Sequence, residues 1–214
     1  MLSSLERPSD ETANLITHAA GFLMSLAAAF FLMRSVVLAG GGPRVALACG
    51  VYSAALVTLY LASALSHSFH DIKLRALFRT FDQACIFLMI AGSFTPFAVV
   101  FLNHGRWWML LAAIWALAFA GVSFALRRRE MSRRDKFAYA ALGLTAALSF
   151  REIYNAAPLN VSILLLAGCL CYLFGSVFLG LGKKTKYCHA LWHIFVLAGS
   201  ACHYICIAAY IAAP

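Results

Sequence analysis

Residues 159–181 read LNVSILLLAGCLCYLFGSVFLGL, an apolar run in which no position carries a charged side chain. A transmembrane helix needs about 20 predominantly apolar residues, so this stretch is long enough to cross a bilayer. Hydrophobic and polar residues do not alternate along it, which excludes the pattern of a transmembrane β-strand. Similar runs occur elsewhere along the chain, and together they predict seven membrane-spanning helices. The predicted spans are residues 15–39, 45–68, 82–102, 107–126, 137–155, 159–181 and 188–212.

The composition of the whole chain agrees with this prediction. Of its 214 residues, 63% are hydrophobic and only 12% are charged, whereas about a quarter of the residues in soluble proteins are charged. So little charge does not cover a water-facing surface, which excludes an ordinary soluble enzyme, a disordered chain and a secreted disulfide scaffold. Because the seven spans use most of the chain, we expect residues 1–214 to form one all-α domain, a bundle of seven transmembrane helices.

The distribution of charge predicts how the bundle is oriented. The chain has 17 Lys and Arg against 8 Asp and Glu, and loops rich in Lys and Arg stay in the cytoplasm. A cytoplasmic N-terminus places thirteen cationic residues inside, namely Arg7, Lys73, Arg75, Arg79, Arg127, Arg128, Arg129, Arg133, Arg134, Lys136, Lys183, Lys184 and Lys186. It leaves four outside, namely Arg34, Arg44, Arg106 and Arg151. We therefore predict a plasma-membrane protein with its N-terminus in the cytoplasm and its C-terminus outside, whose cations face anionic lipid rather than nucleic acid.

Several polar side chains are predicted at one depth, near the cytoplasmic end of the bundle. They are Glu11, Asn14 and His18 of the first span, Ser63 and His67 of the second, Asp82 of the third, and His189 and His193 of the seventh. Spacings of three and four residues place the first group on one helical stripe and the last two histidines on one helix face. Because polar groups inside a bilayer are costly, each of these residues is a candidate functional residue.

Three of these side chains match the ligands of a catalytic metal ion. Imidazoles four residues apart, as in His189 and His193, can share one ion, and His67 from another helix would complete a set of three. Three protein ligands plus a water are typical of catalytic zinc, and zinc makes its bound water a nucleophile at neutral pH. Asp82 would then orient that water or take its proton, and Ser63 would hydrogen-bond an imidazole or a substrate oxygen.

Other interpretations of the same residues remain open. Helical histidines also hydrogen-bond carbonyl groups of neighbouring helices, and the polar residues at the starts of the first and third spans would serve as helix caps. His203 follows His193 by ten residues, about 15 Å along a helix, which is too far to share the same metal. Residues 73–81 place apolar side chains opposite basic ones, which predicts a separate short helix on the inner membrane surface.

Taken in order, the segments around these residues resemble the haemolysin III branch of the PAQR (progestin and adipoQ receptor) family. The matching segments are Glu11-Thr-Ala-Asn14-Leu-Ile-Thr-His18, Ser63-Ala-Leu-Ser-His67, Asp82 with the later Ile86-Phe87 and Ala91-Gly92-Ser93-Phe94-Thr95-Pro96, and His189-Ala-Leu-Trp-His193. The resemblance covers nearly the whole chain and implies a seven-helix bundle in a bacterial inner membrane. It also implies a zinc ion held by three histidines beside an acidic residue and a serine. The residues that match are His67, His189, His193, Asp82 and Ser63.

The resemblance leaves the role of the first-helix motif, Glu11, Asn14 and His18, unspecified. Gln83 stands where many bacterial members have a histidine, which argues against a fourth histidine ligand. The implied activity is that of a zinc-dependent hydrolase of a lipid amide or ester, similar to a ceramidase. Two alternatives accompany it: a non-enzymatic regulator or sensor of the membrane with a structural zinc, and a haemolysin-type pore. Membrane lipids are the expected surroundings and the candidate substrate.

Overall fold

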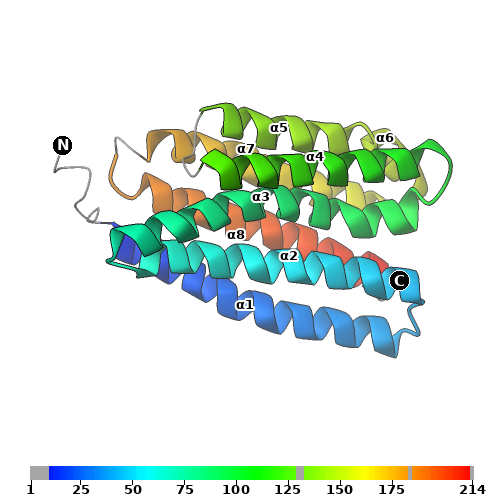
Figure 1. Ribbon diagram of the computed structural model, residues 1–214. Coiled ribbons are helices and arrows are strands. Elements are labelled where there is room, and N and C mark those ends of the chain that lie inside the picture. Colours follow the sequence, from blue (N-terminus) through cyan, green and yellow to red (C-terminus); the bar gives the residue numbers. More distant parts are fainter. Residues whose placement is uncertain (1–9, 129–132, 183–184, 213–214) are drawn as a thin grey trace.

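The computed structural model describes residues 10–128, 133–182 and 185–212. These residues form helices and no strands, in the order α1 (Glu11–Leu38), α2 (Pro43–Ser68), α3 (Ile72–Phe101), α4 (Arg106–Arg128), α5 (Arg133–Ala147), α6 (Phe150–Ala156), α7 (Leu159–Leu181), α8 (Cys188–Ile207) and the π-helical turn η1 (Ala208–Ala212). The helices run up and down one bundle, so that α1 begins at one end and α8 with η1 finishes at the other (Figure 1). The predicted all-α bundle is confirmed.

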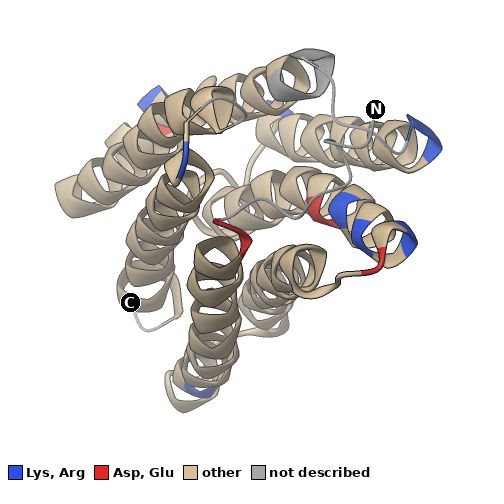
Figure 2. Ribbon diagram, turned by 90° about the vertical axis from the view of Figure 1, so that its left-hand side faces the viewer, with Lys and Arg blue, Asp and Glu red and all other residues tan. Residues whose placement is uncertain are grey.

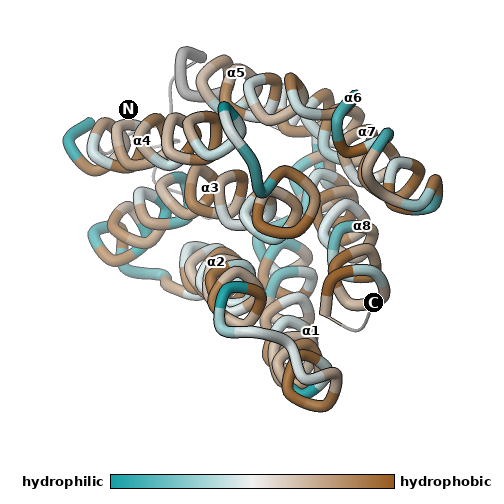
Figure 3. The backbone as a smooth tube through the Cα atoms, turned by 90° about the vertical axis from the view of Figure 1, so that its right-hand side faces the viewer, coloured by the Kyte–Doolittle hydropathy of each residue, from teal (hydrophilic) through white to brown (hydrophobic). Residues whose placement is uncertain are grey.

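Six of the described helices are long and apolar enough to cross a membrane, namely α1, α2, α3, α4, α7 and α8 with η1. Their ends agree with the predicted spans to within a few residues, apart from the start of α3. Large apolar side chains such as Leu23, Phe30 and Leu173 are exposed on the outer faces, and hydrophobic residues run along the helices (Figure 3). Since such faces are stable in lipid rather than in water, the chain is a multi-pass integral membrane protein.

The predicted span 137–155 is not one continuous helix, because it is broken between α5 and α6. The break lies at Leu148 and Ser149, whose backbone N–H groups bond carbonyls three residues earlier. The hydroxyl of Ser149 also donates to the carbonyl of Ala146 at 2.7 Å. This side-chain bond offers the backbone a local alternative to the helical pattern. The fifth pass along the bundle is therefore made of two shorter helices.

The predicted surface helix at 73–81 is not separate from the third span. Asp71 caps the helix by accepting a hydrogen bond from the N–H of Leu74 at 2.8 Å, and α3 then continues without interruption to Phe101. A helix of 30 residues is about 45 Å long, which exceeds the hydrocarbon thickness of about 30 Å. The first turns of α3 therefore extend beyond the span that begins near Asp82.

Close helix contacts and a buried hydroxyl cluster hold α2 and α7 against α8. The Tyr60 hydroxyl donates to Oγ of Ser200 at 2.9 Å, and the Tyr172 hydroxyl lies 3.1 Å from the same atom. Gly21 lets α1 approach Tyr60, since a Cβ there would lie only 2.7 Å from the tyrosine ring. These contacts fix the relative depth of α1, α2 and α8, the three helices that carry most of the predicted polar residues.

Candidate metal centre

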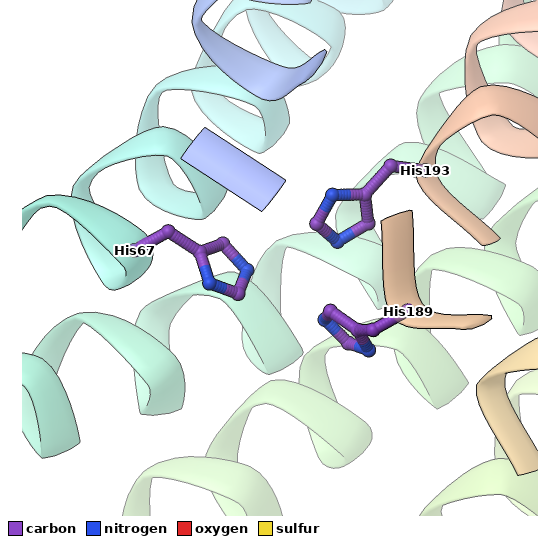
Figure 4. A group of neighbouring side chains, drawn as sticks. All are labelled: His67, His189 and His193. Atoms are coloured by element: carbon purple, nitrogen blue, oxygen red, sulfur yellow. The ribbon is translucent and has the colours of Figure 1, made fainter. Parts of the chain in front are cut away.

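Three histidines from two helices meet at one end of the bundle. His67 lies at the end of α2, and His189 and His193 lie on the first turns of α8. One nitrogen of each ring lies within 4.8 Å of the others, and the three rings face a common space (Figure 4). His67 and His193 are buried, while His189 is half-buried. The sequence prediction that these three side chains converge is thus confirmed by their positions.

The start of α8 is held in place by the start of α1. Tyr187, which precedes α8, has a left-handed backbone conformation with φ of 65°, and its N–H donates to Oδ2 of buried Asp10 at 3.0 Å. This bond fixes the first turn of α8, where His189 is located. The sequence interpretation missed Asp10, although it directly precedes Glu11 of the first-helix motif.

Glu11 connects the histidine cluster to a cation at the end of the bundle. One carboxylate oxygen bonds Nδ1 of His67, and the other accepts a hydrogen bond from Arg79 of α3 at 2.8 Å. Glu11 is only 2% exposed, whereas the Arg79 side chain is 45% exposed. With Nδ1 held by the carboxylate, Nε2 is the atom of His67 that would ligate a metal. Carboxylate–histidine pairs of this kind orient the ring and increase its basicity as a ligand.

Thr17 has an equivalent role for the second ring. Its hydroxyl lies 3.1 Å from Nδ1 of His193 and also bonds the carbonyls of Ala13 and Asn14, both at 2.9 Å. Nε2 of His193 is therefore the atom that would ligate a metal. Thr17 was not among the predicted residues. Thr17 lies six residues after Glu11 and three after Asn14, which places it beside the stripe of the first-helix motif. This spacing could have identified it from the sequence.

Asp82 and Ser63 lie beside the histidines rather than among them. Asp82 lies on α3 and is partly buried, with His67 and Arg79 as its charged neighbours and Ser63 of α2 as its hydroxyl neighbour. It is not one of the three residues whose ligand atoms cluster. The arrangement suits a carboxylate that acts on a group next to a metal. Ser63 was predicted to bond an imidazole or a substrate oxygen, and in the structure its hydroxyl bonds the Asp82 carboxylate.

Asn14 and His18 are buried on the same stripe of α1, each only 3% exposed. The His18 ring lies 3.7 Å from that of His193 and 5.3 Å from that of Tyr60, measured between ring centroids. Among the described residues, neither ring nitrogen of His18 nor Oδ1 of Asn14 has a hydrogen-bond partner. All the predicted residues thus gather near the starts of α1 and α8 and the end of α2, with Asp82 about three turns into α3. Figure 2 is viewed from this end of the bundle.

The donor set fits a zinc ion. It consists of three imidazoles, which suit zinc better than calcium or magnesium, and two of the rings have their remaining nitrogen held by Glu11 or Thr17. In the described parts of the chain, no other set of three His, Cys, Asp or Glu side chains comes together in this way. His203 is not part of the set, as its distance along α8 predicted.

Comparison with known proteins gives an independent classification. A family model described as haemolysin-III related matches residues 7–204. A Bacillus cereus protein named Hemolysin-3 is 36% identical over 203 residues, covering 94% of this chain and 92% of that protein. The Hemolysin-3 homolog of Bacillus subtilis is 31% identical over 203 residues, covering 94% of each chain. The human monocyte to macrophage differentiation factor is 28% identical over 172 residues, covering 75% of this chain and 69% of that protein.

Proposed function

Because the chain belongs to the haemolysin-III related family and brings three histidines together in a membrane bundle, we propose that it is a zinc-dependent hydrolase of a lipid amide or ester. The observation that carries this proposal is the cluster of His67, His189 and His193, with a carboxylate beside it but outside it. A purely structural zinc site is usually closed by four protein ligands, whereas three leave one position open.

The proposed chemistry divides between the metal and the side chains. When bound by the three histidines, zinc would supply Lewis acidity toward a carbonyl oxygen and a water acidic enough to react at neutral pH. Asp82 would accept the proton from the attacking water and deliver it to the leaving amine or alcohol. Ser63 would keep the Asp82 carboxylate oriented. Glu11 and Thr17 would hold the rings of His67 and His193 in position.

The proposed setting is the plasma membrane of a bacterium, with the metal centre near the cytoplasmic face. The charge count supports this orientation, since the described cations Lys73, Arg79 and Lys186 belong to the end of the bundle that holds the histidines. A lipid substrate would reach this depth from the surrounding leaflet. Cysteine labelling of the two ends of the bundle in intact cells tests the orientation, which is contradicted if the start of α3 is labelled from outside.

The decisive experiment compares lipids and metal together. Protein purified without chelator should contain about one transition-metal ion per chain by elemental analysis. Mass spectrometry of lipids from cells that express the wild type should show a lipid depleted and its cleavage product enriched, while His67→Ala cells should match cells without the protein. Absence of stoichiometric metal from the wild type, or identical lipids in all three strains, refutes the hydrolase.

A structural role for the metal is the second candidate, and one feature favours it. The histidines and their partners Glu11 and Thr17 connect α1, α2 and α8, so a bound ion would pin three helices. On this alternative, removing the metal with a chelator lowers the unfolding temperature and no lipid changes in any strain. The haemolysin-type pore remains a third hypothesis. Dye release from liposomes at low protein-to-lipid ratio would support it.

A further inference from the structure

Two side chains of the α1 stripe, Asn14 and His18, have buried polar atoms without a hydrogen-bond partner among the described residues. Glu11 bonds His67 and Arg79, and Thr17 bonds its own helix and His193. Asn14 and His18 lie on the same stripe and are as deeply buried as Glu11. Yet Oδ1 of Asn14 and both ring nitrogens of His18 are unpartnered among the described residues. Buried polar atoms are normally hydrogen-bonded, so these three atoms require a partner other than the described residues.

The chemistry of the three atoms restricts that partner. The carbonyl oxygen of Asn14 only accepts, so the partner must donate to it. A neutral imidazole donates a hydrogen bond through one ring nitrogen and accepts one through the other. The two nitrogens of His18 therefore need one group that accepts a hydrogen bond and one group that donates a hydrogen bond. A hydroxyl or the N–H and C=O of an amide meets both requirements. The carbonyl and ether oxygens of a simple ester only accept and leave Oδ1 of Asn14 without a partner.

The position of these atoms connects them to the metal centre. The His18 ring packs directly on that of His193, and the Thr17 hydroxyl bonds both Nδ1 of His193 and the backbone carbonyl of Asn14. His18 lies one turn further along α1 than Asn14, and therefore further from the end of the bundle at which α1 begins. His18 thus lies against the histidine cluster, and Asn14 lies on the same stripe one turn nearer the end of the bundle. The part of a lipid next to the reacting carbonyl would lie along this stripe.

We infer that Asn14 and His18 form a subsite that binds a hydrogen-bond donor of the substrate, adjacent to its scissile carbonyl. The inference rests on the proposed hydrolase function and deepens it. A substrate with an amide N–H or a neighbouring hydroxyl is preferred over one whose reacting region only accepts hydrogen bonds. Asn14 and His18 are thereby specificity-determining residues, separate from the metal ligands and from Asp82.

The test measures binding of three fluorescent lipids with equal chain lengths to the purified, metal-loaded protein in detergent. One carries a secondary amide, the second the N-methylated amide and the third the corresponding ester. The ester lacks the donor without extra bulk, and the N-methyl amide lacks it while remaining an amide. The wild type should bind the secondary amide roughly tenfold more tightly than either of the others. Hydrolysis of the same lipids is followed in parallel.

Asn14→Leu removes the acceptor and keeps the number and branching of the side-chain heavy atoms, and His18→Phe removes both ring nitrogens. Each should reduce the preference for the secondary amide to less than about twofold. Because the preference is a ratio within one sample, a partly unfolded variant does not change it. The matched control is Ser25→Ala, since Ser25 is buried on the same helix but bonds the carbonyl of Phe22 at 2.7 Å. The control should retain the wild-type preference.

The outcomes separate this inference from the proposed function. If a lipid is hydrolysed but the wild type binds all three lipids equally, the subsite is refuted while the hydrolase stands. If none is hydrolysed but the wild-type preference exists and Asn14→Leu abolishes it, the subsite stands and the hydrolase fails. Equal loss of preference in Ser25→Ala and Asn14→Leu also overturns the inference, because the effect would then not be specific to the two side chains with unpartnered atoms.

Discussion

Glu11 and His67 form a buried carboxylate–imidazole pair although 56 positions separate them in the sequence. The pair joins the first turn of α1 to the last turns of α2 and leaves Nε2 of His67 as the ligand atom. Arg79 occupies the other oxygen of the carboxylate at 2.8 Å. A buried charge without partners would be strongly unfavourable, so the two partners explain how a glutamate is stable at the end of a membrane bundle.

Replacing Glu11 by Gln should lower the affinity of the protein for zinc by about 10–100-fold, because the His67 ring loses the carboxylate that orients it and raises its basicity. Competition with a chromophoric chelator measures the affinity. Glu152→Gln is the matched control, because Glu152 also pairs with a histidine but lies outside the metal centre. Its Oε1 is 3.5 Å from Nε2 of the exposed His104. An unchanged affinity in Glu11→Gln would show that the pair does not support the metal.

Replacing Thr17 by Val should also lower zinc affinity, by about tenfold. Valine has nearly the same shape but has no hydroxyl for Nδ1 of His193, so the ring becomes free to rotate. Thr58→Val serves as the control, because Thr58 is exposed on α2 and bonds the carbonyl of Ala54 at 2.6 Å. The same chelator competition gives both values, and equal affinities for the two variants would contradict the proposed role of Thr17.

Asp82→Asn should leave the zinc content unchanged and reduce hydrolysis by at least about 100-fold, since asparagine keeps the shape but does not accept a proton. Elemental analysis and turnover of the lipid identified by mass spectrometry are measured on the same preparation. Loss of zinc together with activity would instead place Asp82 among the ligands. Full activity in the zinc-loaded variant would exclude Asp82 as the proton acceptor.

Gly168→Ala should destabilise the bundle, because a Cβ at Gly168 of α7 would lie 2.4 Å from the ring of His203 of α8. Overpacking of this kind costs about 1–3 kcal/mol. Gly180→Ala is the matched control on the same helix, since a Cβ there meets nothing within 4 Å. Thermal unfolding in detergent should give a lower Tm for Gly168→Ala and an equal or higher Tm for Gly180→Ala. The reverse order would contradict the contact.

Local properties of the sequence were sufficient to predict most of the helices and the depth of the polar residues in the bundle. The length of an apolar run determines whether it crosses a bilayer, so α7 coincides with the predicted 159–181. Spacing of three or four residues determines a shared helix face, which placed His189 and His193 together. The same local properties gave wrong predictions for two helix boundaries. The break at Ser149 is accompanied by a bond from its hydroxyl to Ala146, and the start of α3 at Ile72 is capped by Asp71. Apolar periodicity reveals neither bond.

The sequence by itself determined that this chain is an α-helical membrane bundle and that His67, His189, His193 and Asp82 lie near one end. Only the tertiary structure decided which side chain contacts which: Glu11 with His67, Thr17 with His193, and Asp10 with the backbone before α8. Such pairs join different helices, and their contacts depend on how those helices are rotated and packed. The rotation and packing of the helices depend on many residues at once, including Gly21 and Ser200. The spacing of residues along a single helix does not reveal them.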